Sequence, residues 1–256
     1  MGVKNFKVTI ITPAHNEENT IEKCIESVKN LTKPESVELE HVIVADRCTD
    51  RTVELSKKQG VTVLEKNFHD QNVWPITETV DYGIKNTSSE IIGKVDADII
   101  LEKDWLIKLL PHLDEKTISI SSSIKTRTGK MGMDFLMWLR DINYRIIPLS
   151  REPRGGARIL NRELLNKIGG LDYDKPTFDT ALDMRIRKLG YKSKLVVNAG
   201  ATEIRQLTIK GIVKHQLSSG EARKKLGISF GRTLMHSIFR IKPFVILGYL
   251  RTYFKR

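Results

Sequence analysis

Short runs of β-branched residues alternate with amphipathic segments along the first half of the chain. These runs predict strands at residues 7–12, 39–45, 61–64 and 91–95. Apolar residues at helical spacing predict helices around residues 21–28, 76–84 and 105–113. Strands that alternate with helices are typical of βαβ units, so we expect a largely parallel sheet.

The second half has a different pattern. Residues 118–122 and 155–160 look like strands, and a long helix is predicted between them at 133–147. Beyond Ala201 the strand pattern fades and basic, helical sequence follows. We therefore expect an α/β domain with a mixed, mainly parallel, Rossmann-like sheet over residues 1–204, followed by a helical basic extension over residues 205–256.

Charge is spread unevenly along the chain. The 256 residues include 43 Lys and Arg against 31 Asp and Glu, a formal net charge of +12. From Arg185 onward the acidic residues are Glu203 and Glu221 alone. Such an excess could serve nucleic acid or an anionic membrane surface. We expect the membrane surface and no nucleic acid.

Other features bound the class of protein. Two cysteines, Cys24 and Cys48, are too few for a disulfide framework or a cysteine-rich zinc site. The first residues lack a signal-peptide pattern, and no apolar run reaches the roughly 18 residues of a membrane-spanning helix. The segment 241–256, with apolar residues between basic flanks, could lie in a membrane interface or pack as an ordinary C-terminal helix. We expect a cytoplasmic protein able to associate peripherally with the inner face of the cell membrane.

Polar clusters follow three of the predicted strands. They comprise residues 13–18 (PAHNEE), 46–52 (DRCTDRT) and 96–98 (DAD). In open α/β sheets, ligands collect at the carboxyl ends of the strands. We expect the three clusters to meet there.

Asp96 and Asp98 carry the most weight among these residues. Two carboxylates placed two residues apart after a buried strand repel each other unless a cation compensates them. Mg²⁺ or Mn²⁺ suits such a pair, with water and phosphate as the remaining ligands. Alternatively, one carboxylate caps the helix that begins near Lys103 and the other is solvated.

Four ordered motifs together resemble the family 2 glycosyltransferases, inverting enzymes of the GT-A fold. The motifs are TIITPAHNEENTI, VIVADRCTDRT, VDAD, and GGARILNRELLNKIGGLD followed by TFDTALDMRIRKLGY. The resemblance covers about Val8 to Tyr191, and it implies transfer of a sugar from a nucleotide-diphosphate sugar, with Mn²⁺ or Mg²⁺, to an acceptor hydroxyl or a lipid-linked acceptor.

The resemblance also implies a role for particular residues. Asp98 corresponds to the metal ligand and Asp179 to the catalytic carboxylate, which takes a proton from the acceptor. The positions implied to bind the donor are Pro13, Ala14, His15, Glu17, Asp46 and Asp96.

Some positions depart from the family pattern. Ala45, Phe178 and Ala181 stand where the family often has acidic residues, and Asp183, one turn after Asp179, is a rival base. These departures keep open a catalytically degenerate protein that acts as a scaffold or binds nucleic acid. A nucleotidyltransferase is less favoured, because residues 13–18 contain no Gly, Lys or Arg to hold a triphosphate.

Overall fold

The structure is a computed structural model that describes residues 6–129, 131, 132, 134, 135, 137, 138, 155–176, 178–204 and 209–253. The chain divides into two compact units. The first contains residues 1–124, 153–174 and 178–204, and the second contains residues 125–152, 175–177 and 205–256. We describe each unit by itself.

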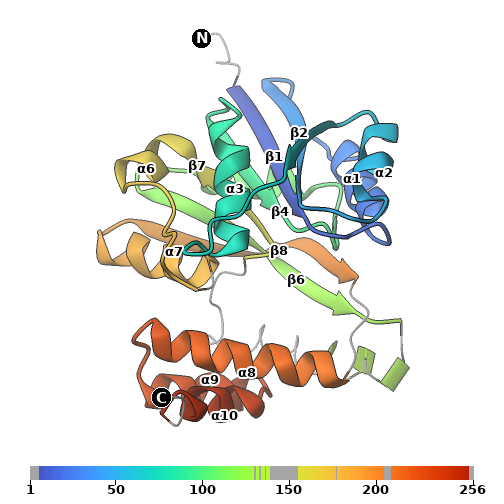
Figure 1. Ribbon diagram of the computed structural model, residues 1–256. Coiled ribbons are helices and arrows are strands. Elements are labelled where there is room, and N and C mark those ends of the chain that lie inside the picture. The colour runs from blue at the N-terminus through green and yellow to red at the C-terminus, as the bar shows by residue number, and fades with distance from the viewer. Residues whose placement is uncertain are drawn as a thin grey trace. The chain divides into compact units, whose positions relative to one another are not determined.

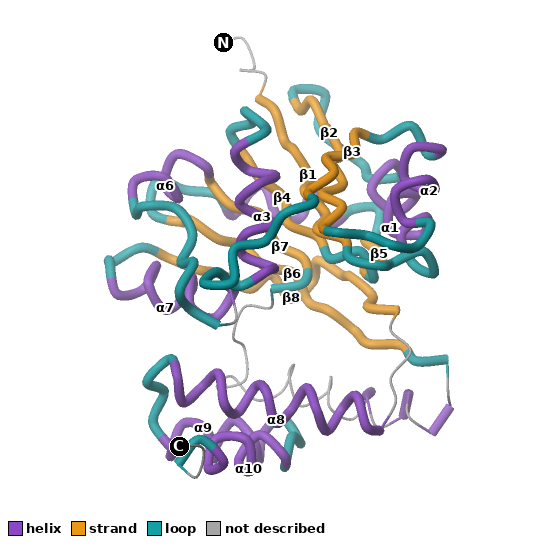
Figure 2. The backbone as a smooth tube through the Cα atoms, viewed as in Figure 1, coloured by secondary structure: helices purple, strands orange, loops and turns teal. Residues whose placement is uncertain are grey.

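An eight-stranded mixed sheet forms the centre of the first unit (Figures 1 and 2). Its strands are β1 (Phe6–Ala14), β2 (Val37–Asp46), β3 (Thr62–Lys66), β4 (Ile91–Val95), β5 (Ile99–Leu101), β6 (Thr117–Arg127), β7 (Ala157–Asn161) and β8 (Lys192–Ile204). The order across the sheet is β3-β2-β1-β4-β7-β6-β8-β5. The first four strands in that order are parallel, and β7 is antiparallel to β4 and β6. The predicted mixed, mainly parallel sheet is confirmed.

Helices cover both faces of the sheet (Figure 1). They are α1 (Ile21–Lys29), α2 (Thr52–Lys58), α3 (Pro75–Lys85), α4 (Trp105–Leu109), the 3₁₀ turn η1 (Leu110–His112), α6 (Arg162–Lys167) and α7 (Phe178–Lys188). One hydrophobic cluster packs α1 and α4 on the sheet, and another packs α3, α6 and α7. The strands therefore bury both faces, as parallel strands in α/β proteins do.

Local sequence explains where some of these elements begin and end. Pro75 occupies the first turn of α3, where its missing N–H costs nothing. Pro111 lies in the 3₁₀ turn that follows α4, where a proline stops the α-helix from continuing. The Asn161 side chain caps α6 by accepting from the Leu164 N–H at 3.0 Å. Strands β5 and β8 are not among those that the hydrophobic pattern of the sequence predicts.

In the second unit, the described residues from 209 to 253 form the helices α8 (Ile209–Lys225), α9 (Phe230–Phe239) and α10 (Phe244–Arg251). Helices α8 and α10 touch through their backbones, because a Cβ on Gly220 or Gly248 would lie 2.0 Å from a carbonyl oxygen of the opposite helix. The described residues between 131 and 138 are helical, and the rest of the helix predicted at 133–147 lies outside the described residues. Among the described residues, no helix is long and apolar enough to cross a membrane.

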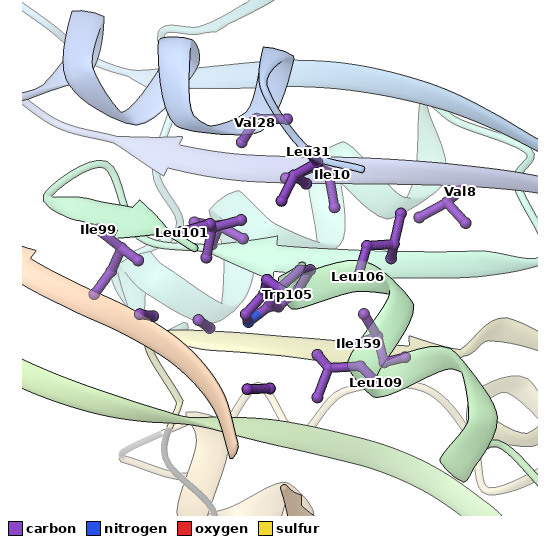
Figure 3. Close-up of a cluster of buried hydrophobic side chains, with 14 of the residues drawn as sticks. Val8, Ile10, Val28, Leu31, Ile99, Leu101, Trp105, Leu106, Leu109 and Ile159 are labelled. Atoms are coloured by element: carbon purple, nitrogen blue, oxygen red, sulfur yellow. The ribbon is translucent and has the colours of Figure 1, made fainter. Parts of the chain in front are cut away.

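Trp105 is the largest fully buried side chain of the cluster beneath α1 and α4 (Figure 3). Its indole lies among residues from β1, β5, α4 and β7, including Ile10, Leu101 and Ile159. We expect Trp105→Ala to lower the free energy of unfolding by about 3–5 kcal/mol, because the cavity cannot collapse between so many elements. Urea denaturation checks this value.

Trp138→Ala is the matched control, since Trp138 is 55% exposed and stacks on Phe135. We expect it to cost less than about 1 kcal/mol. Equal costs for the two substitutions would contradict the packing described for Trp105.

Candidate functional site

The first two polar clusters meet where β1 and β2 end. His15 Nδ1 lies 2.6 Å from the main-chain oxygen of Asp46, and Cys48 Sγ donates to the Ala14 oxygen at 3.4 Å. Pro13 and Ala14 are buried at the end of β1, whereas the His15 ring is exposed. The parallel register that pairs Ala14 with Ala45 brings these segments together, as expected for adjacent strand ends.

The third cluster joins them around the Cys24 thiol. Cys24 Sγ donates to the main-chain oxygen of Asp96 at 3.6 Å. Burial, with a smaller contribution from the carboxylates of Asp96, Asp98 and Glu17, raises the pKa of Cys24 to about 12. Cys24 therefore ties the segment after β4 to helix α1, and β4 pairs with β1, so the third cluster follows the strand next to that of the first. That the three clusters form one site stays a prediction.

Asp46 is a buried carboxylate between two cations. Arg47 binds both of its oxygens at 2.9 Å, and the fully buried Lys66 donates to Oδ1 at 3.1 Å. Burial alone would raise the pKa of Asp46, but the hydrogen bonds from Arg47 and Lys66 outweigh it and hold the pKa below its usual value. Lys66 also pairs with Glu78 of α3 at 2.8 Å. Asp46 is thus fixed and ionised at neutral pH.

Asp96 is also paired with a buried cation. Lys94, 3% exposed within β4, donates to Asp96 Oδ1 at 2.5 Å and to the Gly155 carbonyl at 2.9 Å. The Asp96 side chain itself remains about one-third exposed, at 33%. The Asp96 N–H donates to the Gly156 carbonyl at 2.8 Å, which ties the strand end to the start of β7.

Asp98 lies two residues further on, where its carbonyl accepts from the Ile204 N–H of β8 at 2.8 Å. Its side chain is buried. Within the described residues, no group of three or more His, Cys, Asp or Glu side chains could hold a metal ion alone. The carboxylate of Asp98 is a hard oxygen ligand, which suits Mg²⁺ or Mn²⁺ when phosphate and water supply the remaining ligands.

Helix α7 carries two aspartates with different surroundings. Asp183 is buried and receives both Arg158 nitrogens at 3.2 Å and the Ser193 hydroxyl at 2.6 Å. Asp179, half-buried in the first turn, lies against Gly155, where a Cβ would come within 2.5 Å of Asp179 Oδ2. A side chain at position 155 would therefore clash with Asp179. Asp179 thus lies beside the backbone of Gly155, whose carbonyl accepts a hydrogen bond from Lys94.

Glu17 and Asp50 support the loops of this region. The Glu17 N–H donates to the Thr52 hydroxyl at 2.7 Å, and its carboxylate accepts from Thr20 at 3.0 Å. Asp50 accepts from the Glu18 N–H and from the Thr52 N–H, both at 3.0 Å. Glu17 thus orders the loop after β1.

Sequence reasoning missed the burial of the cations Lys66, Lys94 and Arg158. The one available signal was charge inside otherwise apolar strands, as with Lys94 in IIGKV and Arg158 in ARILN. A charge in a buried strand needs a partner. The partner's identity comes only from the fold.

The profile of a family described as Glycosyl transferase family 2 matches residues 9–171. The probable glycosyltransferase YdaM of Bacillus subtilis strain 168 is 26% identical over 201 residues, which are 72% of this chain and 47% of that protein. The low-salt glycan biosynthesis hexosyltransferase Agl6 of Haloferax volcanii is 31% identical over 103 residues, 40% of this chain and 24% of that protein. The chain thus spans about half the length of YdaM and about a quarter of the length of Agl6.

Two solved structures show the same fold. The mannosyltransferase PcManGT from Pyrobaculum calidifontis, in complex with GDP-Man and Mn²⁺, aligns with a TM-score of 0.67 at 18% identity, over 96% of this chain and 70% of that chain. Glucosyl-3-phosphoglycerate synthase from Mycobacterium tuberculosis, in complex with Mg²⁺ and UDP, aligns with a TM-score of 0.59 at 18% identity, over 88% of this chain and 80% of that chain. The predicted GT-A arrangement is confirmed.

The surroundings of the two α7 aspartates predict that substitutions there destabilise the protein to different extents. Asp183→Asn leaves Arg158 buried without a counter-charge, so we expect a loss of about 3–5 kcal/mol in the free energy of unfolding. Asp179→Asn should cost less than about 1 kcal/mol, because its side chain is only half-buried. Thermal unfolding followed by circular dichroism compares the two. A larger loss for Asp179→Asn would contradict the structural role of Asp183.

Proposed function

The chain belongs to glycosyl transferase family 2, and from that premise we propose that it moves a sugar from a nucleotide-diphosphate sugar to an acceptor hydroxyl or a lipid-linked acceptor, with inversion. The observation that carries this proposal is the convergence of Asp46, Asp96 and the loop with His15 where β2, β4 and β1 end. Ligands bind at such strand ends in open α/β sheets.

We assign the nucleotide to the segments after β1 and β2. An ionised Asp46 can accept a hydrogen bond from a ring N–H of a base. Its lowered pKa keeps it ionised at neutral pH, which supports this role. Pro13, Ala14, His15 and Glu17 then form the adjoining floor, with the exposed His15 ring next to Asp46.

We place the sugar and diphosphate near Asp96 and Asp98. Asp96, one-third exposed and held by Lys94, serves as an acceptor toward the donor, and Asp98 would hold Mn²⁺ or Mg²⁺. A bound divalent cation supplies charge neutralisation for the departing nucleoside diphosphate. The metals and nucleotides in PcManGT and glucosyl-3-phosphoglycerate synthase support this choice.

Asp179 is the proposed base. An inverting transfer needs one carboxylate to take the proton of the acceptor hydroxyl as it attacks the anomeric carbon. Asp183 holds Arg158 and Ser193, whereas Asp179 lies at the Gly155 turn next to the groups assigned to the donor. This arrangement favours Asp179 over its rival.

We propose an anionic membrane surface as the partner of the C-terminal extension. Residues 205–256 carry twelve Lys and Arg against one acidic residue, Glu221. Large apolar side chains on α9, α10 and the turn between them are exposed, among them Ile238 at 60%, Ile241 and Leu247. Basic and exposed apolar residues together favour binding to anionic bilayers. Tyr249 does not contribute, because it is buried and donates to the Ile228 carbonyl at 2.9 Å.

The donor site is tested by thermal unfolding with UDP, GDP, CDP and dTDP, each with and without Mn²⁺. We expect one nucleotide to stabilise the protein in a Mn²⁺-dependent manner, by about 2.7 kcal/mol at one hundred times its Kd. The shift should be lost in Asp98→Ala and kept in Asp104→Ala, whose side chain is exposed and pairs with Lys108. No shift with any nucleotide would contradict the proposal.

Membrane binding is tested by sedimentation with vesicles. We expect the protein to bind vesicles containing phosphatidylglycerol and not pure phosphatidylcholine, with affinity falling as salt rises. Ile238→Glu should weaken binding, whereas Ile107→Glu on α4 should leave it unchanged. Equal binding to neutral vesicles, or none to either kind, would rule the partner out.

A further inference from the structure

Arg47 is the first residue after β2, and Asp46 holds its guanidinium in one orientation. Arg47 Nε donates to Asp46 Oδ1 and Nη2 donates to Oδ2, both at 2.9 Å. The Arg47 N–H donates to the Lys66 carbonyl at 2.9 Å, and the φ of Arg47 is 49°, in the left-handed region that residues other than glycine rarely adopt. Strained backbone of this kind concentrates at ligand sites.

The Asp46 carboxylate keeps room for one more hydrogen bond. A carboxylate offers about four acceptor positions. Among the described residues, Oδ1 accepts from Arg47 and Lys66, whereas Oδ2 accepts from Arg47 alone. The Asp46 side chain is 6% exposed and that of Arg47 is 37% exposed. A ligand that reaches Oδ2 therefore also meets Arg47, because Nη2 binds the same oxygen.

The guanidinium of Arg47 keeps donors for a ligand. Asp46 takes two of the five N–H groups that an arginine has. In the part of the chain that the structure describes, no group accepts a hydrogen bond from Nη1, and this nitrogen is not buried. The guanidinium is planar, so one N–H of Nη1 and the second N–H of Nη2 point in the same direction. Arg47 therefore presents a pair of parallel donors next to the acceptor of Asp46.

Exposed aromatic rings lie close to this pair. His15, whose ring is exposed, lies with Nδ1 2.6 Å from the main-chain oxygen of Asp46. Lys66 Nζ, which binds Asp46, lies 4.7 Å from the ring centroid of Phe68, a residue that is 54% exposed. Aromatic rings stack on every kind of base, so they add affinity without choosing among bases. The choice of base falls to the polar groups.

We propose that Arg47 selects the base of the donor nucleotide and that this base is guanine. The inference rests on the proposed function, because it names the substrate of the same site. Asp46 Oδ2 accepts from the ring N–H at N1, and the two parallel donors of Arg47 bind O6 and N7, the acceptor pair that arginine also binds in DNA. Guanine alone among the common bases carries a ring N–H and two acceptors in a row.

The other common bases satisfy part of this arrangement only. Uracil and thymine have a ring N–H, but it lies between their two carbonyl oxygens, so no two acceptors are neighbours. Cytosine has neighbouring acceptors at N3 and O2 and no ring N–H. In adenine, an amino group lies between the acceptors N1 and N7. With each of these bases at least one polar group of the site stays without a partner, which lowers affinity.

Isothermal titration calorimetry with Mn²⁺ tests the proposal on wild type, Arg47→Lys and Arg47→Gln. The ligands are GDP, UDP, CDP and ADP, together with IDP, which keeps N1–H, O6 and N7, and 7-deaza-GDP, which lacks N7. Lysine keeps the charge and loses the parallel donors. The control is Arg51→Lys, because Arg51 is an exposed arginine of the same loop that pairs with Glu18 at 3.2 Å.

We expect wild type and Arg51→Lys to bind GDP and IDP at least about tenfold more tightly than UDP, CDP and ADP. The affinity of wild type for 7-deaza-GDP should be about tenfold below that for GDP, since one hydrogen bond to a charged group is lost. Arg47→Lys should bind GDP more weakly and no longer distinguish it from 7-deaza-GDP. Lys66 remains as a counter-ion of Asp46 in both variants, and Arg47→Gln serves if Arg47→Lys does not fold.

Wild type that binds UDP, CDP or ADP as tightly as GDP would overturn the proposal and leave the donor site in place. The same holds if 7-deaza-GDP binds wild type as tightly as GDP, or if the Arg47 variants lose the same factor for every nucleotide. If no nucleotide binds, the proposed function fails and the role of Arg47 fails with it.

Discussion

Burying a charge without a partner costs several kcal/mol, and the strands of this sheet bury three cations. Lys66, Lys94 and Arg158 are each nearly or fully inaccessible to water. Their acidic partners are Asp46, Asp96 and Asp183, in that order. Each pair joins two elements, or a strand to the loop that follows it, and so fixes the backbone around the proposed site.

The acidic residues of these three pairs have different roles. Asp183 holds Arg158 inside the first unit, whereas Asp46 and Asp96 are held at the strand ends where a donor would bind. Asp179 is placed by contact with Gly155, whose carbonyl Lys94 binds. One ammonium therefore links a residue assigned to the donor with the turn against which the proposed base lies.

Periodicity predicted most of the sheet because its strands are short, β-branched and separated by amphipathic helices. It gave no strand at Ile99–Leu101, which is too short for a pattern, or at Lys192–Ile204, whose residues alternate poorly. The acidic clusters were found because they follow strands directly. The counter-ions Lys66 and Arg158 could not be found in this way, because each lies far from its partner in the sequence. Lys66 meets Asp46, and Arg158 meets Asp183, only after folding brings the segments together. The same limit applies to Asp183, because its ion pair with Arg158, which favours Asp179 as the proposed base, forms only in the folded protein.

A crystal structure of the protein with its nucleoside diphosphate and Mn²⁺, using the anomalous signal of manganese, tests the central claim most directly. The account predicts manganese next to Asp98 and the base next to Asp46. Manganese bound away from Asp98, or a nucleotide bound away from the ends of β1, β2 and β4, would contradict it.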